Sequence, residues 1–216
     1  MWDMNTAIRK PRQPGRPARD EQPEVRQRLV DAAEIRFTAQ GYAESSIRSI
    51  AEQAGVNPAL ISYHFGGKLG LLEAVFERAL APLAGALQAL GDSDGATPDD
   101  LLALLGRMGQ EHPNLLPLLL REALLPSGAL HEAFIDRFAP RLGGMFPTLL
   151  RRAQAAGRLH EDVDPEALSV LILALGIFPQ VASPIARRVL GIDPEQGGQE
   201  RLARQAHQLL ERGVKP

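Results

Sequence analysis

The chain has 216 residues, of which 44% are hydrophobic and 23% are charged, and it contains no cysteine. This length and composition suit a globular protein with one larger domain or two small ones. The lack of cysteine excludes disulfides, thiolate metal sites, cysteine nucleophiles and thiol redox sensing. No apolar run reaches the roughly 20 residues of a membrane-spanning helix, and the first residues lack the apolar core of a signal peptide. We therefore expect a cytoplasmic protein that makes no membrane contact.

The charge is distributed unevenly along the chain. The formal net charge is −2, but residues 1–19 hold five basic residues and one acidic residue, so this segment carries +4 and the remainder −6. Prolines and a glycine among these charges predict a flexible arm over residues 1–22. A basic arm on an acidic body is common in proteins that touch nucleic acid with one end. A solvated leader without a function would look the same.

Hydrophobic spacing predicts helices along the whole chain, so the expected fold class is all-α. Apolar residues from residue 24 onward recur at helical intervals and end at Gly41, a typical C-terminal stop. A further long helix is expected over about residues 68–90, and the rest of the chain continues as helical patterns interrupted by prolines. These patterns predict a small N-terminal domain over residues 23–70 and a larger C-terminal domain over residues 71–216.

Two short helices with a glycine between them follow the first predicted helix. Ser45 and Ser46 can cap the second helix, and Gly55 ends it. Asn57 then caps a third helix, with Pro58 in its first turn, where the missing N–H costs no helical hydrogen bond. This arrangement predicts a helix-turn-helix.

The third helix leaves a face that is suited to DNA. An α-helix fits the major groove and meets base edges chiefly through its N-terminal residues. Ala59 and Leu60 can touch thymine methyl groups but cannot form bidentate hydrogen bonds. Tyr63 and His64 can donate to phosphates. The third helix is therefore predicted to anchor the protein on DNA more than it reads the bases.

Two cations lie beside this helix. Arg48 is the one long cationic side chain on the second helix, and arginine bidentate to guanine is the commonest specific base contact. The alternative for Arg48 is an ordinary solvated arginine. Lys68 begins the fourth helix, where a cation is unfavourable for the helix dipole, and phosphate binding would compensate for this cost.

Gly41-Tyr42 and the following SSIRSIAEQAGVNPALISYHFGGKLGLL resemble the DNA-binding domain of the TetR family of transcriptional regulators. The match is dense and covers about residues 24–72. It implies a helical homodimer whose third helices enter successive major grooves of a palindromic operator, with a C-terminal domain that binds a small-molecule effector. The GRPAR segment also resembles the arm that precedes the first helix in many members. The predicted DNA-binding residues are Arg16, Ser45, Ser46, Arg48, Asn57, Pro58, Ala59, Leu60, Ser62, Tyr63, His64 and Lys68.

Two positions depart from the family pattern. Leu69 follows Lys68 where an acidic residue is common, so Lys68 is expected to lack a local ion pair. Arg36 stands where an apolar residue is usual, so a small shift in the packing of the first helix is expected. Neither departure removes the motif.

The C-terminal domain is expected to hold a pocket and a dimer interface. Ligand pockets are apolar with a few polar groups, although each apolar candidate could instead be plain core. The candidate effector-binding residues are Arg107, Met108, His112, Arg121, Glu122, His131, Phe134, Phe138 and Met145, with Gln110 and Phe146 as further candidates. Apolar stripes on the last helices pair across a two-fold axis in the resembled family, and the alternative is packing within one chain. The candidate interface residues are Leu168, Leu171, Ile172, Leu175, Leu202, Ala206 and Leu209.

No cofactor, metal or catalytic site is expected. None of the five histidines has a second histidine four residues away, and no cysteine is present to complete a site. The sequence also lacks a glycine-rich phosphate loop and a nucleophile elbow. The sequence thus predicts a ligand-responsive repressor. The alternatives are an effector-independent activator or architectural DNA-binding protein with a solid C-terminal domain, and an enzyme or small-molecule carrier that kept the helix-turn-helix as scaffold.

Deletion of residues 1–19 should weaken DNA binding and flatten its dependence on salt concentration. The physical reason is that arm arginines release counterions from DNA, and Arg16 is the one we expect to lie in a narrow minor groove. Fluorescence anisotropy with labelled operator over a series of salt concentrations measures both quantities. Unchanged affinity and slope in the deletion variant would contradict the role of the arm.

Overall fold

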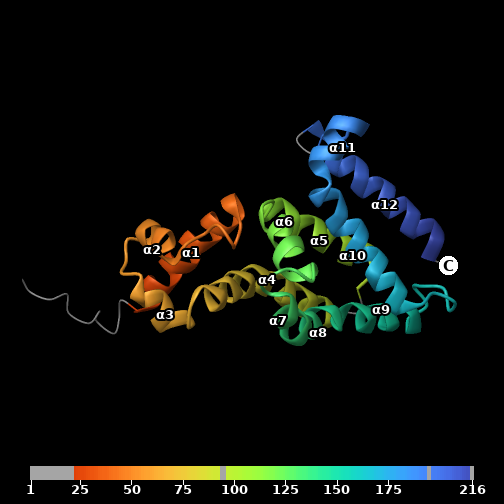
Figure 1. Cartoon of the computed structure of the whole chain (residues 1–216). Helices are drawn as coiled ribbons and strands as arrows, with labels where there is room; N and C mark the ends of the chain where they lie inside the picture. The colour runs from red at the N-terminus through yellow and green to blue at the C-terminus, as the bar shows by residue number, and fades with distance from the viewer. Residues whose placement is uncertain (1–21, 93–95, 194–195, 215–216) are drawn as a thin grey trace, which may run out of the picture.

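The computed structural model describes residues 22–92, 96–193 and 196–214, and every regular element within these ranges is a helix. A small N-terminal domain and a larger C-terminal domain are joined by one long helix (Figure 1). The expected all-α class is therefore confirmed for the described residues. Arg16 and the predicted arm lie outside them, except for Gln22.

The N-terminal domain is a bundle of α1 (Gln22–Gln40), α2 (Ile47–Ala54) and α3 (Ala59–Phe65). Helix α1 buries one side, because its apolar residues recur about once per turn. Helices α2 and α3 contribute further buried residues to the same core. The main buried side chains of this bundle are Val25, Leu29, Ala33, Phe37, Ile50, Ala51 and Ile61.

Local signals set the ends of the two short helices. Ser46 Oγ accepts a hydrogen bond of 3.0 Å from the Ser49 N–H and so caps α2. Gly55 ends α2 with a φ of 66°, a left-handed conformation that favours glycine. Asn57 Oδ1 then accepts from the Ala59 N–H at 2.9 Å. The turn between α2 and α3 is thus fixed by residues within it.

The C-terminal domain is an assembly of helices that prolines and glycines interrupt. Two of its segments, η1 and η2, are π-helical turns, which often mark functional regions. Its elements are α5 (Pro98–Glu111), α6 (Leu115–Leu119), η1 (Leu120–Leu124), α7 (His131–Ala133), η2 (Phe134–Phe138), α8 (Ala139–Gly143), α9 (Met145–Ala155), α10 (Pro165–Val181), α11 (Ser183–Leu190) and α12 (Gly198–Val214).

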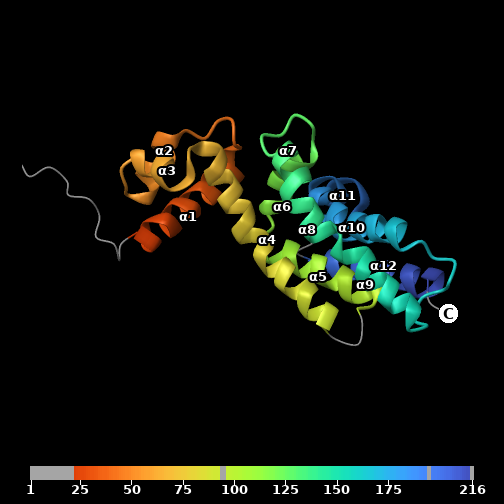
Figure 2. The same cartoon turned by 90° about the horizontal axis from the view of Figure 1, so that it is seen from below.

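Helix α4 (Lys68–Asp92) connects the two domains (Figure 2). Its first half packs on α1 and α3, and its second half packs on α5 and α9. Its 25 residues span about 37 Å at 1.5 Å per residue. The domain boundary expected after residue 70 falls in the first turn of this helix. A shift of α4 therefore acts on both domains.

Side-chain caps start two helices of the C-terminal domain. Thr97 Oγ1 accepts from the Asp100 N–H, and Asp100 Oδ2 accepts from the Thr97 N–H at 2.8 Å, which forms a complete capping box for α5. Thr97 is thus the N-cap residue of α5. Asp164 caps α10 by accepting from two backbone N–H groups.

Helices α10 and α11 meet at a sharp bend. Pro179 lies inside α10 near its end, and none of the residues of α11 is buried. Within the described residues no single helix is long and apolar enough to span a membrane. Among the described helices, only α10 and α11 taken together have the length and apolar composition of a membrane span, and the two helices meet at a bend of 71°.

Glycines let α5 and α10 approach closely. A Cβ atom on Gly176 would lie 2.7 Å from the Cβ of Leu105, which is closer than side-chain atoms pack. On the facing helix, Gly109 leaves room for the Gln180 side chain, which donates 2.8 Å from Nε2 to the Gly176 carbonyl. At each of these two positions, a side chain of one helix therefore packs directly on the backbone of the other, with one layer of side chains between them.

Gly176→Ala should destabilise the protein by about 1–3 kcal/mol, because the new methyl group forces α5 and α10 apart. Gly85→Ala is the matched control, since Gly85 lies inside α4 with no atom within 4 Å of its would-be Cβ. That control should stabilise the protein by about 0.5–1 kcal/mol through helix propensity. Urea unfolding followed by circular dichroism measures both changes, and equal effects of the two variants would contradict the close approach.

Candidate functional site

Helix α3 has one buried side and one exposed side. Ile61 is fully buried, whereas Tyr63 is 62% exposed. The ring of His64 stands edge-on to the Tyr63 ring, with 4.9 Å between the centroids. Pro58, Ala59 and Ser62 are also exposed, and Leu60 is partly buried. The exposed side thus joins small residues at the start of the helix to polar aromatic tips near its end.

Helix α2 adds a cation and a capped helix start beside this surface. Arg48 is exposed in the first turn of α2, and its side chain has no hydrogen bond or ion pair within the part of the chain described. Ser46 is exposed as well, although its hydroxyl already serves as the cap. Both positions are open to a partner that approaches α2 and α3. The start of α2 and the exposed side of α3 are therefore both accessible, as in a helix-turn-helix that contacts DNA.

Ser45 does not belong to this surface, and its prediction as a DNA contact is wrong. The residue is fully buried, and its hydroxyl donates 2.7 Å to the Gly41 carbonyl. Gln40 Nε2 lies 3.3 Å from the same hydroxyl. The side chain therefore closes the turn between α1 and α2. Two adjacent serines look alike in the sequence, but only Ser46 faces outward.

Lys68 is held within the protein. Its Nζ donates 3.2 Å to the Ala43 carbonyl and lies 4.3 Å from the centroid of the Tyr42 ring. The expectation of no local ion pair agrees with the described residues, since these two contacts are to a carbonyl and a ring. Lys68 thus ties the start of α4 to the turn before α2. A phosphate contact from Lys68 stays a prediction.

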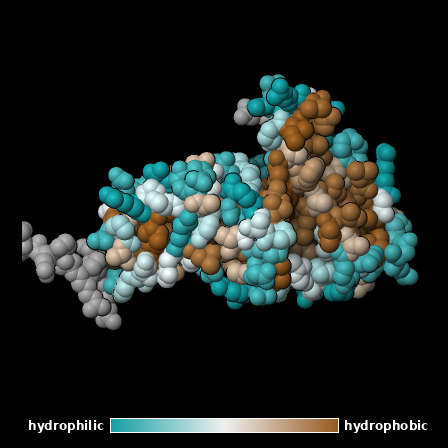
Figure 3. Space-filling view, in the orientation of Figure 1, coloured by the Kyte–Doolittle hydropathy of each residue, from teal (hydrophilic) through white to brown (hydrophobic). Residues whose placement is uncertain are grey.

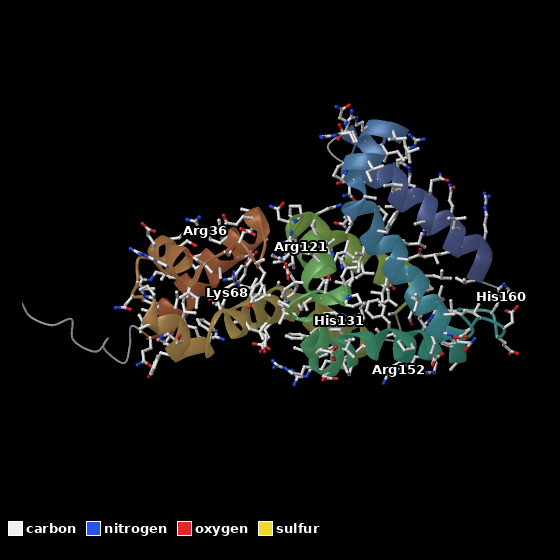
Figure 4. All side chains as sticks on the ribbon, in the orientation of Figure 1. Arg36, Lys68, Arg121, His131, Arg152 and His160 are labelled. Atoms are coloured by element: carbon white, nitrogen blue, oxygen red, sulfur yellow. The ribbon has the colours of Figure 1, made fainter. Side chains whose placement is uncertain are left out.

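Arg36 bridges two helices of the N-terminal domain. Its Nε donates to Gln53 Oε1 on α2, and Figure 4 shows Arg36 on the N-terminal domain. The neighbouring Ile35 is 56% exposed. The arginine therefore lies across the surface of the bundle, with its charged end toward α2. It adds a polar contact between α1 and α2 where an apolar residue is usual.

The candidate effector residues do not converge on one pocket. Met108 and Phe138 belong to the core, and Arg107 is exposed on α5. Phe138 stacks on Phe134 at 6.1 Å between centroids, and Met145 lines a separate hollow beside α4. A pocket built from all nine residues is therefore wrong. Their spacing on the chain places them on helices that face different ways.

Three of these residues instead organise the turn after η1. Arg121 Nε donates 2.8 Å to Glu122 Oε1, and the buried Glu122 also accepts from the Ala129 N–H at 3.4 Å. His131 Nδ1 lies 3.0 Å from the Ala123 carbonyl. Figure 4 shows Arg121 and His131 on the side of the C-terminal domain that faces the N-terminal domain. These hydrogen bonds fix the conformation of the turn that follows η1.

Arg121 also contacts the end of α1. Its Nη2 lies 3.5 Å from the Phe37 carbonyl, and a Cβ on Gly41 would lie 3.1 Å from the same nitrogen. Gly41 has a φ of 91°, so both its conformation and its space require glycine. Burial raises the pKa of the adjacent Tyr42, and the negative charge of Glu122 raises it further. The two domains therefore meet through charged groups at this point.

A cavity that the sequence did not predict lies between α5, α10, α11 and α12. It has a volume of about 300 Å³, and a smaller hollow of about 200 Å³ adjoins it through Gln180 and Gln199. Gln180 Nε2 is occupied by backbone carbonyls, while Oε1 has no hydrogen-bond donor among the described residues. Glycines within predicted helices were the available signal, since they mark close approach. The residues lining the larger cavity are Gly109, Pro113, Gln180, Ser183, Pro184, Arg187, Asp193 and Gln199.

The candidate dimer stripe separates into two sets. Leu168 and Ile172 are buried inside the protomer, so they cannot form an interface with a second chain, and Ala206 is nearly as buried. Leu171 and Leu209 are exposed, and Leu175 and Leu202 are partly buried around the smaller hollow. Helix α10 is apolar on several sides, which is why spacing alone could not separate its inner face from its outer face.

Two family models match the chain. Residues 29–75 match the bacterial regulatory proteins of the tetR family, and residues 99–213 match the tetracyclin repressor-like C-terminal domain. The second match spans more than half of the chain, and the first covers the three-helix domain with its exposed helix-turn-helix. The chain has the architecture of a helix-turn-helix transcriptional regulator. It belongs to the TetR family.

Curated relatives and solved structures agree with this assignment. SrpR of Pseudomonas putida, an HTH-type transcriptional regulator, is 28% identical over 159 residues, which cover 72% of this chain and 70% of SrpR. BetI 2 of Chromohalobacter salexigens is 41% identical over 68 residues, only 32% of this chain and 33% of BetI 2. A TetR regulator from Haloarcula marismortui has a TM-score of 0.66 at 22% identity, over 89% of this chain and all of that one. A SmeT–triclosan complex has a TM-score of 0.67 at 22% identity, over 89% and 92%.

Arg48→Ala should weaken binding to a specific DNA site by roughly 1–3 kcal/mol and relax sequence preference at one base pair. The reason is the loss of a bidentate base contact from a guanidinium that is exposed on α2. Tyr63→Phe is the comparison, since it removes only an exposed hydroxyl. It should weaken binding slightly and by the same factor for every DNA sequence. Competition binding against single-base variants of the site measures the difference. Equal loss on every sequence for Arg48→Ala would contradict a base contact.

Proposed function

We propose that the protein is a homodimeric repressor that binds an inverted-repeat operator through α2 and α3 and leaves it when a small molecule binds the C-terminal domain. The observation that carries this proposal is the exposed side of α3, with Tyr63 at its end and, beside it, Arg48, which has no ion pair among the described residues. A rigid three-helix core holds both residues. Such a surface matches the major groove in size and in hydrogen-bonding character.

The dimer interface is the apolar surface of α10, α11 and α12. Figure 3 shows hydrophobic residues gathered over this part of the C-terminal domain. A surface of this kind is rare on a protein that stays monomeric, and a two-fold axis would let it cover itself. Its most exposed members are Val170, Leu171, Phe178, Ile185, Val189, Leu190 and Leu209.

Dimerisation gives the DNA-binding helices a fixed separation. Two α3 helices reach successive major grooves when they lie about 34–36 Å apart, one turn of B-DNA. Helix α4 runs from α3 into the C-terminal domain, so the C-terminal dimer determines this separation. A change of a few ångströms is then enough to weaken binding.

The effector site is the cavity around Gln180. Its volume is at the lower end for small-molecule sites, and the adjoining apolar hollow enlarges it. Gln180 Oε1 offers an acceptor over Gly109, so the expected ligand is a small molecule with an apolar body and a hydrogen-bond donor. Triclosan, the ligand named for the similar SmeT structure, is a phenol of this kind and serves as a first probe.

The effector acts on DNA binding through α5 and η1. The cavity is lined by Gly109 near the end of α5, and the chain then passes through α6 to η1, where Arg121 contacts the end of α1. An effector that prefers one arrangement of these helices lowers DNA affinity, and DNA lowers effector affinity by the same factor. A hollow C-terminal domain supports this mechanism over an effector-independent DNA-binding protein, which was expected to have a solid one.

The full-length protein should retard DNA from the region flanking its own gene, with two chains bound for each inverted repeat. Leu171→Glu should weaken that complex at least about tenfold, because a charge at the interface opposes dimerisation. A monomer that binds one half-site does so less tightly than a dimer that binds both. Ile135→Glu is the control, since Ile135 is similarly exposed but lies on η2, away from α10 and α12. Gel shift with analytical ultracentrifugation measures both effects. Equal affinity for scrambled DNA would contradict the proposed function.

A further inference from the structure

Three potential metal ligands meet where α12 crosses the start of α5. His207 and Glu211 stand one helical turn apart on α12, and Asp99 lies in the first turn of α5. His207 Nδ1 is 2.7 Å from Asp99 Oδ1. One ligand atom from each residue lies within 4.8 Å of the others. These residues have no part in DNA binding or in the cavity around Gln180.

We propose that Asp99, His207 and Glu211 bind a divalent first-row transition-metal ion. An imidazole nitrogen with two carboxylates suits Zn²⁺ and its neighbours better than Mg²⁺, which takes oxygen ligands. Two carboxylates also carry the two negative charges that balance such an ion. The site goes beyond DNA binding and the effector response, because it concerns how the last helix is held.

The geometry needs only small adjustments. Two ligands on one tetrahedral zinc ion lie about 3.4 Å apart, so His207 and Asp99 must separate by less than about 1 Å. Glu211 must turn toward His207 by a change of side-chain rotamer. Solvent reaches the cluster and can supply the remaining ligands as water. No helix has to move.

The capping of α5 directs Asp99 toward the site. Asp100 is engaged with Thr97 in the capping box, so of the two acidic residues in this turn it is Asp99 that extends to α12. The positive end of the α5 dipole opposes a cation here, and the two ligand carboxylates offset that effect. An ion bound at this position would join α12 to α5 through coordinate bonds.

Helix α12 has few other attachments to its own protomer. Of its 17 residues only Gly198, Ala206 and Leu210 are buried. A metal ion would therefore stabilise the position of a helix that hydrophobic contacts hold weakly. Because α12 also carries part of the apolar surface, metal binding would order that surface.

The test is calorimetric titration of the EDTA-treated full-length protein with ZnCl₂ and, separately, with MgCl₂. We expect one Zn²⁺ per chain, much weaker Mg²⁺ binding, and a higher melting temperature with Zn²⁺. His207→Ala should abolish Zn²⁺ binding and the rise in melting temperature. Glu211→Gln should lower the Zn²⁺ affinity by at least about tenfold. His160→Ala is the control, because His160 is exposed and distant in sequence from the cluster.

Circular dichroism of the metal-free variants shows whether they remain folded, and Glu211→Gln gives a second reading if His207→Ala does not. Equal Zn²⁺ binding by wild type and both cluster variants would overturn the proposal. No Zn²⁺ binding by wild type, or Mg²⁺ binding as tight as Zn²⁺, would overturn it too. In those cases the cluster is a set of surface polar contacts that includes the pair of His207 with Asp99.

Discussion

The position of the DNA-binding domain depends on how Arg121 meets the last turn of α1. The guanidinium lies against the carbonyl end of that helix, where a cation is favourable, and the absent side chain of Gly41 makes room for it. Buried Glu122 holds the arginine from the other side, and Tyr42 connects this contact to Lys68 at the start of α4. The same few residues thus join the C-terminal domain, the turn before α2 and the connecting helix. A movement of η1 can reach the helix-turn-helix through these residues, through α4, or through the packing of α6 on α1.

The second constraint is the close approach of α5 and α10. Gly176 and Gly109 bring the two backbones together, and Gln180 fills the space that a side chain at residue 109 would take. The same contact leaves a cavity on the outer side, bounded by the bend between α10 and α11. The smaller hollow beside it reaches the apolar surface through Leu175, Leu202 and Leu209. The proposed effector site and the proposed dimer interface therefore share helices, which would give a small molecule a direct way to alter the separation of two α3 helices.

The helix-turn-helix could be predicted from the sequence because its signals are local. Ser46, Gly55 and Asn57 act on residues within one or two turns of themselves, and the structure confirms those caps and stops. Burial depends on distant partners, and there the sequence was insufficient. It could not tell Ser45 from Ser46, or the inner leucines of α10 from Leu171. The pairing of Asp99 with His207 joins residues 108 positions apart and leaves no periodic signal in the sequence. The effector pocket was predicted on residues such as Arg121 and Glu122, which instead form contacts around the turn after η1.

We infer that the C-terminal domain positions the DNA-binding domain through Arg121, and the operator affinity of the Arg121→Ala variant checks this inference. Arg121 lies outside α2 and α3, so its replacement changes the contact between the domains and leaves the DNA-facing side chains in place. We predict that Arg121→Ala binds the operator roughly fivefold more weakly, because a smaller fraction of molecules holds the competent arrangement. Arg107→Ala, which removes an exposed arginine of the same domain, should leave the affinity unchanged. Equal operator affinity for Arg121→Ala and wild type would contradict the account.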